Sequence, residues 1–164
     1  MCGIQRERGH KSFARVARKA KSSLGWFLGF KLHLLTSAQG ALLRFWLTPA
    51  STHDVRALDL EGFLEGVQGT LIGDNAYTGR SRQAQLAERG LGLLVRPRKR
   101  DAKELPPKLQ ALFQRRRRIE TAIGQLKAQY GLGCLSSCRG INALKTLVFS
   151  ALVLYSLNWE ARKA

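Results

Sequence analysis

Acidic residues are scarce in this sequence of 164 residues. Eleven Asp and Glu stand against 28 Lys and Arg, which gives a formal net charge of +17. So large an excess of one sign destabilises a small folded domain by self-repulsion unless a polyanion neutralises it. Nucleic acid is therefore the expected partner. An anionic membrane surface is the weaker alternative, because no basic amphipathic helix dominates the sequence.

Cysteines are also few, and no long apolar segment is present. Cys2, Cys134 and Cys138 do not form a disulfide framework, so free thiols in a reducing, cytoplasmic compartment are expected. Cys134 and Cys138 have a spacing that could hold zinc, but no second ligand pair at finger-like spacing accompanies them. The N-terminus lacks the apolar part of a signal peptide. The longest apolar stretch, residues 146–157, is too short to span a bilayer and predicts a buried helix.

The first 23 residues are predicted to form a basic arm. Seven basic residues lie there with Glu7 as the single acid, so the arm is either a solvated segment or a contact to phosphates, and is expected to be poorly ordered alone. Residues 24–164 are predicted to form one domain, because 45% of the chain is hydrophobic and its length suffices for a core.

The domain begins with a predicted β-hairpin. "FLGFKLHLL" alternates, with Phe30 and Leu32 on one face and Lys31 and His33 on the other, and "ALLRFWLTP" follows after the turn "SAQG". The stretch "DVRALDLEGFLEGV" then predicts a helix, capped by Thr52 or Asp54.

Strands and helices alternate in the rest of the chain. "TLIGD" and "LGLLVRP" predict two strands, joined by the helix "SRQAQLAERG" that Gly90 closes. A long helix is predicted over residues 108–130 and a last apolar helix over 141–161. This order indicates a mixed α/β fold, an antiparallel hairpin joined to a parallel portion and flanked by helices. Binding sites in such sheets lie at the carboxyl ends of parallel strands, and Asp74 follows one such strand.

Two acidic residues are candidates for a site. Asp74, in "GDNAYTGR", is either an ordinary turn residue or a metal ligand. Glu120 is the only acid between residues 108 and 158, and helical spacing sets it beside Arg116 and Lys127 on the flank of an apolar stripe. The simpler interpretation of Glu120 is a surface ion pair with Arg116, one helical turn away.

Taken together, these stretches resemble the C-terminal part of insertion-sequence transposases of the DDE type. The resemblance runs from about residue 10 to 160, through "GWFLGFKLHLL", "LTPASTHDVRAL", "GDNAYTGR", "RRRRIETAIGQLK" and "LVFSALVLYSLNW". The second acid of that family stands in a D-x-x-Y context, which is Asp74 with Tyr77 here. The third stands in a helical Y-x2-R-x3-E-x6-K pattern, which here has Phe113 in place of Tyr, followed by Arg116, Glu120 and Lys127.

The resemblance implies a ribonuclease H-like fold and a DNA transposase. Asp74 and Glu120 would be catalytic carboxylates that bind two Mg²⁺ or Mn²⁺ ions, for cleavage at the element's ends and strand transfer into target DNA. Arg116 and Lys127 would contact phosphates, and Tyr77 would stack on or orient DNA, unless it is a packed turn residue. Arg117 and the basic loop residues Arg98, Lys99 and Arg100 are further predicted DNA contacts.

The family's first strand and first Asp have no counterpart in the sequence, where Glu7 is the only acid before residue 54. We therefore expect the first strand to be missing and the chain to be incomplete or inactive alone. It would be a remnant of an element, a downstream reading frame, or a chain with a wrongly assigned start. Two other functions remain open: a basic DNA-binding protein without chemistry, and a general two-metal nuclease of the same fold.

Overall fold

A computed structural model describes residues 13, 15–22, 25–95, 105–132 and 138–162. The chain divides into two compact units. The first combines Met1–Thr52 with Arg118–Ala164, and the second is His53–Arg117.

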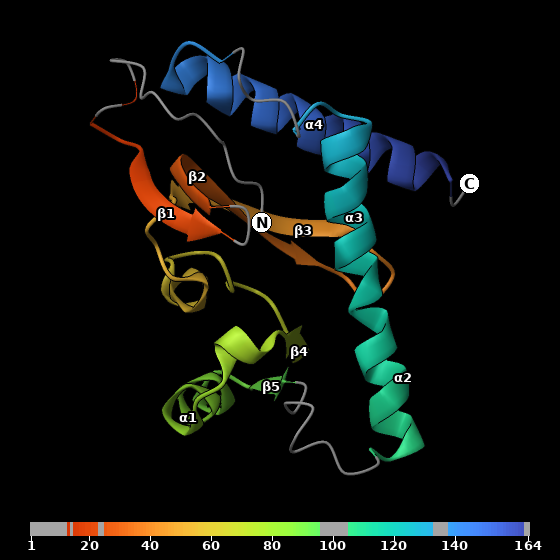
Figure 1. Ribbon diagram of the computed structural model, residues 1–164. Helices are drawn as coiled ribbons and strands as arrows, with labels where there is room; N and C mark the ends of the chain where they lie inside the picture. Colours follow the sequence, from red (N-terminus) through yellow and green to blue (C-terminus); the bar gives the residue numbers. More distant parts are fainter. Residues whose placement is uncertain (1–12, 14, 23–24, 96–104, 133–137, 163–164) are drawn as a thin grey trace. The chain divides into compact units, whose positions relative to one another are not determined.

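The first unit contains an antiparallel sheet of three strands in the order β1-β2-β3 (Figure 1). The strands are β1 (Arg18–Ser22), β2 (Gly25–Thr36) and β3 (Leu42–Pro49). β2 and β3 form the predicted hairpin, with Leu32 opposite Leu47, and Ser37 Oγ accepts hydrogen bonds from the backbone of Gln39 and Ala41 in the turn. β1 was not predicted, since the basic residues of "RKAKS" were assigned to the arm.

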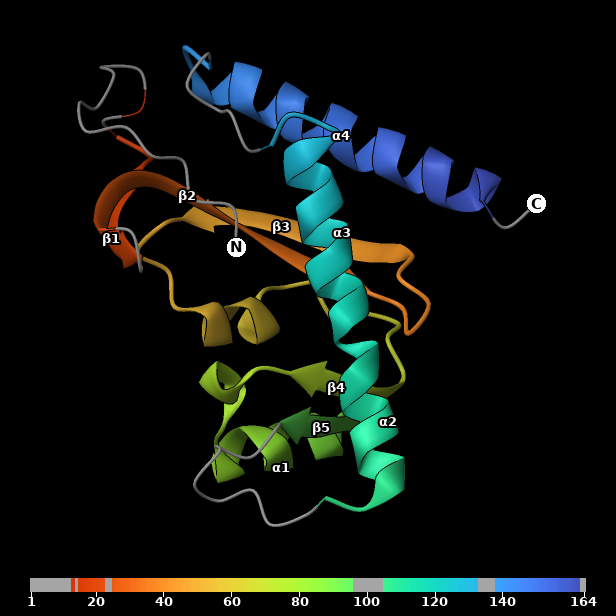
Figure 2. The same ribbon diagram turned by 45° about the vertical axis from the view of Figure 1, so that its right-hand side comes forward.

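Two helices complete this unit, α3 (Arg117–Ala128, all but its first residue) and α4 (Ile141–Ala161). Both views show the end of α3 next to α4 (Figures 1 and 2), and there Asn158 Nδ2 donates to the Tyr130 hydroxyl over 2.8 Å. Their buried side chains share one core with β2, in which Leu126, Leu144 and Leu152 are at most 2% exposed. The Tyr155 hydroxyl, also buried, donates to the Gly40 carbonyl over 2.8 Å. These contacts fix α4 to the hairpin turn.

α4 corrects the prediction of a buried helix. One side of it enters the core, but Phe149, Val153, Leu154 and Leu157 are 60%, 40%, 49% and 62% exposed. The bounds of the helix, Ile141–Ala161, agree with the prediction. Its 21 residues, with a mean hydropathy of 1.3 over the most apolar window, meet the length and composition of a membrane span, as core helices of other folds also do.

The second unit contains two parallel strands, β4 (Gly69–Gly73) and β5 (Leu91–Val95), joined by α1 (Arg80–Glu88). Leu71 lies opposite Leu93, and Gly90 closes α1 with a φ of +73°, as predicted. Two 3-10 helices, η2 (Asp54–Asp59) and η3 (Asn75–Tyr77), and the helix α2 (Pro107–Arg115) belong to the same unit. The strand-helix-strand order places Asp74 directly after the carboxyl end of a parallel strand, as the sequence predicted.

Two helix predictions were wrong in detail. The helix expected from Asp54 is only the 3-10 helix η2 followed by turns, because Gly62 and Gly66 adopt φ of +74° and +68°, which an α-helix does not allow. His53 is its N-cap residue, and no side chain caps it. The long helix expected over residues 108–130 is divided into α2 and α3 at Arg116, whose backbone keeps helical angles of −57° and −29°. The mixed α/β class is confirmed, while its ribonuclease H-like arrangement stays a prediction.

Candidate functional site

Asp74 has two roles in the geometry of the second unit. Its backbone is extended, and its Oδ1 accepts a hydrogen bond from the Asn75 N–H over 2.6 Å, which caps η3. Its side chain is nevertheless 59% exposed. Asp74 is therefore a turn residue, as its position after a strand suggested, and its carboxylate also faces solvent.

Arg116 approaches the same carboxylate from the junction of α2 and α3. Its Nη1 lies 3.8 Å from Asp74 Oδ1, and its side chain is 29% exposed. A pair this open contributes little to folding stability, about 0–1 kcal/mol. Asp74 Oδ1 meets both the Asn75 N–H and Arg116, and because more than half of the side chain is exposed, the carboxylate can reach a further partner. A cation and a carboxylate thus meet at the end of β4.

Tyr77 packs against the backbone just before Asp74. A Cβ atom added to Gly73 would lie 3.1 Å from Tyr77 Cδ2 and 3.3 Å from its Cβ and Cγ, so the ring covers the glycine closely. Burial, followed by the charges of Asp54 and Asp74, raises the pKa of the Tyr77 hydroxyl to about 12. At neutral pH this hydroxyl keeps its proton, so it can donate a hydrogen bond but is a poor nucleophile.

Two residues near this site were not predicted. Asp54 is close enough to Tyr77 to contribute to its raised pKa, although the sequence suggested only a helix cap. Arg82 of α1 donates to the Val55 carbonyl over 2.9 Å and to Asp59 Oδ1 over 3.0 Å, and so ties η2 to α1. No spacing in the sequence connects these residues, because the folding of separate segments brings them together.

Glu120 and Lys127 lie on exposed positions of α3, in its first and last turns. Another side of that helix is buried at Ala122 and Leu126, in agreement with the predicted apolar stripe. Glu120 belongs to the first unit and Asp74 to the second, so their meeting in one site stays a prediction.

The other predicted DNA contacts lie partly in the unit of Asp74 and partly outside the described residues. Arg117, exposed at the start of α3, belongs to the unit that holds Asp74. Arg98, Lys99 and Arg100 lie outside the described residues, as do residues 1–12 of the basic arm. Of the predicted site, the structure thus brings Asp74, Tyr77 and Arg116 together.

The donor chemistry of Asp74 and Glu120 suits a hard cation, because both offer carboxylate oxygens. No group of three or more His, Cys, Asp or Glu side chains gathers within the described part of the chain, so two carboxylates would need a further ligand to form a full metal site. Cys138 is buried in the core of the first unit, and Cys134 lies outside the described residues.

Comparison with known proteins agrees with the two motifs. A family model described as "Transposase DDE domain" matches residues 1–133, a range that contains Asp74, Tyr77, Arg116, Glu120 and Lys127. No curated protein and no solved structure matches the chain. Because the family model covers most of the sequence, the chain belongs to the transposase DDE domain family.

Proposed function

We propose that this protein is a DNA transposase that cleaves the ends of an insertion sequence and transfers them to target DNA in a metal-dependent reaction. The main structural support is the group at the end of β4. There an exposed carboxylate, Asp74, lies 3.8 Å from the guanidinium of Arg116, and Tyr77, three residues later in the chain, keeps its hydroxyl proton. A carboxylate for a cation and two donors for phosphate oxygens are the components that phosphodiester chemistry needs.

Asp74 and Glu120 would hold Mg²⁺ or Mn²⁺. Bound there, the ions would activate the attacking water or 3′-hydroxyl and stabilise the leaving oxygen. Arg116 supports the pairing of these two acids. It contacts Asp74 and precedes Glu120 by only four residues in the sequence.

Basic residues would position the DNA around these carboxylates. Arg116, Arg117 and Lys127 would bind phosphates next to the scissile bond, and Arg98, Lys99 and Arg100 would add contacts along the DNA backbone. Tyr77 would donate a hydrogen bond to a phosphate oxygen or orient the strand. The net charge of +17 supports an extended DNA contact. The protein would act in the cytoplasm, on DNA, as a homo-oligomer.

A third carboxylate is the main requirement of this proposal. Two acids bind divalent ions more weakly than three, and the loss of one ligand lowers catalysis by orders of magnitude. We therefore propose that the chain needs an additional Asp to reach full activity, and that it has little activity alone.

A basic DNA-binding protein without chemistry is the second candidate function. It rests on the charge of the chain and on the absence of a three-residue metal cluster among the described residues. Such a protein would bind element ends or inhibit a complete transposase.

A nicking assay separates the two functions. Supercoiled plasmid carrying the element's ends is incubated with Mg²⁺ or Mn²⁺ and the chain, with or without the polypeptide encoded directly upstream of Met1. If the protein is a transposase, the plasmid should be nicked in at least one of the two reactions. Nicking should be lost in Asp74→Ala and in Glu120→Ala but retained in the control Glu88→Ala, which changes an exposed acid at the end of α1. Absence of nicking in both reactions, with salt-dependent DNA binding intact, would establish the binding protein instead. Equal nicking of plasmid without the ends would indicate a general nuclease.

A further inference from the structure

The exposed apolar side of α4 has no function in the proposed chemistry. Phe149, Val153 and Leu157 follow one another at intervals of four residues, which sets them along one side of the helix, and Leu154 flanks them. Each is at least 40% exposed. A continuous row of exposed large apolar side chains marks an interaction surface.

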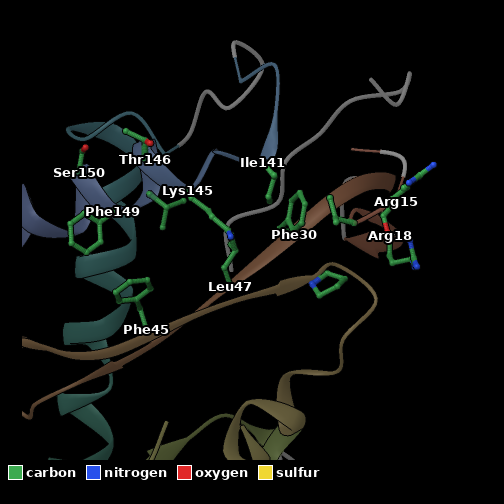
Figure 3. A pocket seen from close by; sticks show the side chains of 13 residues that line it. Arg15, Arg18, Phe30, Phe45, Leu47, Ile141, Lys145, Thr146, Phe149 and Ser150 are labelled. Carbon is green, nitrogen blue, oxygen red and sulfur yellow. Dashed lines mark hydrogen bonds between the residues drawn. The ribbon is translucent and has the colours of Figure 1, made fainter. Parts of the chain in front are cut away.

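A pocket of about 890 Å³ lies along the same helix. Side chains from α4, β2 and β3 line it, among them Phe30, Phe45 and Leu47 of the strands and Lys145 and Phe149 of the helix. Figure 3 shows Phe149 on α4 and Phe45 on β3 at the same end of the pocket, with Lys145 between them and Phe30. Phe45 is 37% exposed. An apolar side chain from a partner can therefore enter beside Phe149.

The two charged residues within α4 lie at opposite ends of the row and are of opposite sign, and Arg162, the C-cap residue, follows the second of them by two positions. Lys145 lies eight residues before Val153 and Glu160 lies seven residues after it, and both are exposed. In a parallel pair of α4 helices, the two copies of Lys145 would lie near each other, and so would the two copies of Glu160. An antiparallel pair centred on Val153 would instead bring Lys145 of each copy near Glu160 of the other.

The apolar side chains follow the same symmetry. Phe149 and Leu157 are each four residues from Val153, so antiparallel pairing sets Phe149 of one copy opposite Leu157 of the other. Val153 then faces its own copy on the two-fold axis, as an isologous interface requires.

We propose that α4 is a self-association surface, on which a second copy of this chain docks its own α4 in antiparallel orientation about Val153. Leu157 of each copy fills the mouth of the pocket beside Phe149 of the other, and two Lys145–Glu160 pairs set the orientation. The charge of +17 on each chain opposes this contact, so salt that screens the long-range repulsion, or bound DNA, favours it. The proposal does not depend on the catalytic site.

Cysteine cross-linking in the full-length chain tests the register. Val153→Cys is made with Cys2 and Cys134 changed to Ser and the buried Cys138 retained. Because a disulfide requires Cβ atoms about 4 Å apart, mild oxidation should yield covalent dimer for Val153→Cys. The matched control Ala143→Cys, also exposed on α4, should yield little, since antiparallel pairing sets the two copies of that residue about 30 Å apart. Equal cross-linking at both positions, or none at Val153, overturns the proposal.

Charge reversal tests the orientation. In sedimentation equilibrium, Lys145→Glu and Glu160→Lys should each weaken dimerisation at least threefold, as expected for the loss of two exposed ion pairs. The double variant should restore it. Additive weakening in the double variant contradicts the antiparallel arrangement. A chain that stays monomeric at every concentration and instead co-sediments with anionic lipid vesicles would assign the α4 face to a membrane.

Discussion

Adding one methyl group at Gly73 tests how the end of β4 holds Tyr77. The new Cβ would lie 3.1 and 3.3 Å from atoms of the Tyr77 ring, closer than ordinary van der Waals contacts, so the ring or the strand end must move. Overpacking of this kind costs about 1–3 kcal/mol, while Gly→Ala at a compatible backbone position stabilises by about 0.4–1 kcal/mol. Gly73 is not among the glycines with positive φ, so its backbone is compatible with alanine, and the cost of overpacking is partly offset by the stabilisation that Gly→Ala gives. We expect Gly73→Ala to lower the free energy of unfolding by about 1–2 kcal/mol.

The effect should depend on the Tyr77 ring. In a Tyr77→Ala background the contacts to the ring atoms are gone and only the contact to the Cβ of residue 77, at 3.3 Å, remains, so Gly73→Ala should cost clearly less than in the wild type. Urea denaturation of the four proteins in this double-mutant cycle measures the coupling. Gly124→Ala is the control, since a Cβ there meets nothing within 4 Å on a helix, and we expect it to stabilise by about 0.5–1 kcal/mol. The reasoning is refuted if Gly73→Ala destabilises equally with and without the tyrosine ring.

Three further predictions concern stability. The raised pKa of Tyr77 means that between pH 10 and about 12 the folded state keeps the hydroxyl proton while the unfolded state loses it. The free energy of unfolding of the wild type should therefore fall over this window by about 2 kcal/mol more than that of Tyr77→Phe. Parallel pH profiles of the two proteins would contradict this. Arg82→Ala removes two hydrogen bonds between α1 and η2 and should lower the free energy of unfolding, measured by urea denaturation, by about 1–3 kcal/mol. The control Arg80→Ala, at an exposed position, should lower it by less than about 0.5 kcal/mol. Equal effects of the two substitutions would refute the role of Arg82. Leu126→Ala, at a site that is 2% exposed, should cost about 2–5 kcal/mol in calorimetry, and a loss below 1 kcal/mol would place Leu126 outside the core.

Sequence patterns predicted the elements with a strong local signal. The hairpin of β2 and β3 follows from alternating side chains, and the parallel pair β4 and β5 from two short apolar stretches around a helix. The apolar stripe of α3 was predicted by helical spacing and confirmed at Ala122 and Leu126. Asp74 was placed correctly because its position depends only on where β4 ends.

Predictions failed where distant segments or backbone angles decide the structure. The helix expected after Asp54 is cut short by glycines with positive φ, which apolar spacing does not reveal. β1 was missed because its side chains are charged, and pairing with β2 makes it a strand. The exposed side of α4 also carries large apolar side chains, Phe149, Val153, Leu154 and Leu157, so an apolar composition alone could not identify the buried side. The approach of Asp54 to Tyr77 is tertiary in origin.

We propose that Asp74 and Glu120 share one metal centre. Ferrous iron can replace Mg²⁺ or Mn²⁺ in a carboxylate site and, with ascorbate and peroxide, produces hydroxyl radicals that cut the nearby backbone. With iron bound in the presence of DNA, we predict cleavage of the chain in two segments, near Asp74 and near Glu120, both lost in Asp74→Ala, in Glu120→Ala and on addition of excess Mg²⁺. Cleavage near only one acid, or a pattern unchanged by either substitution, would contradict the shared centre.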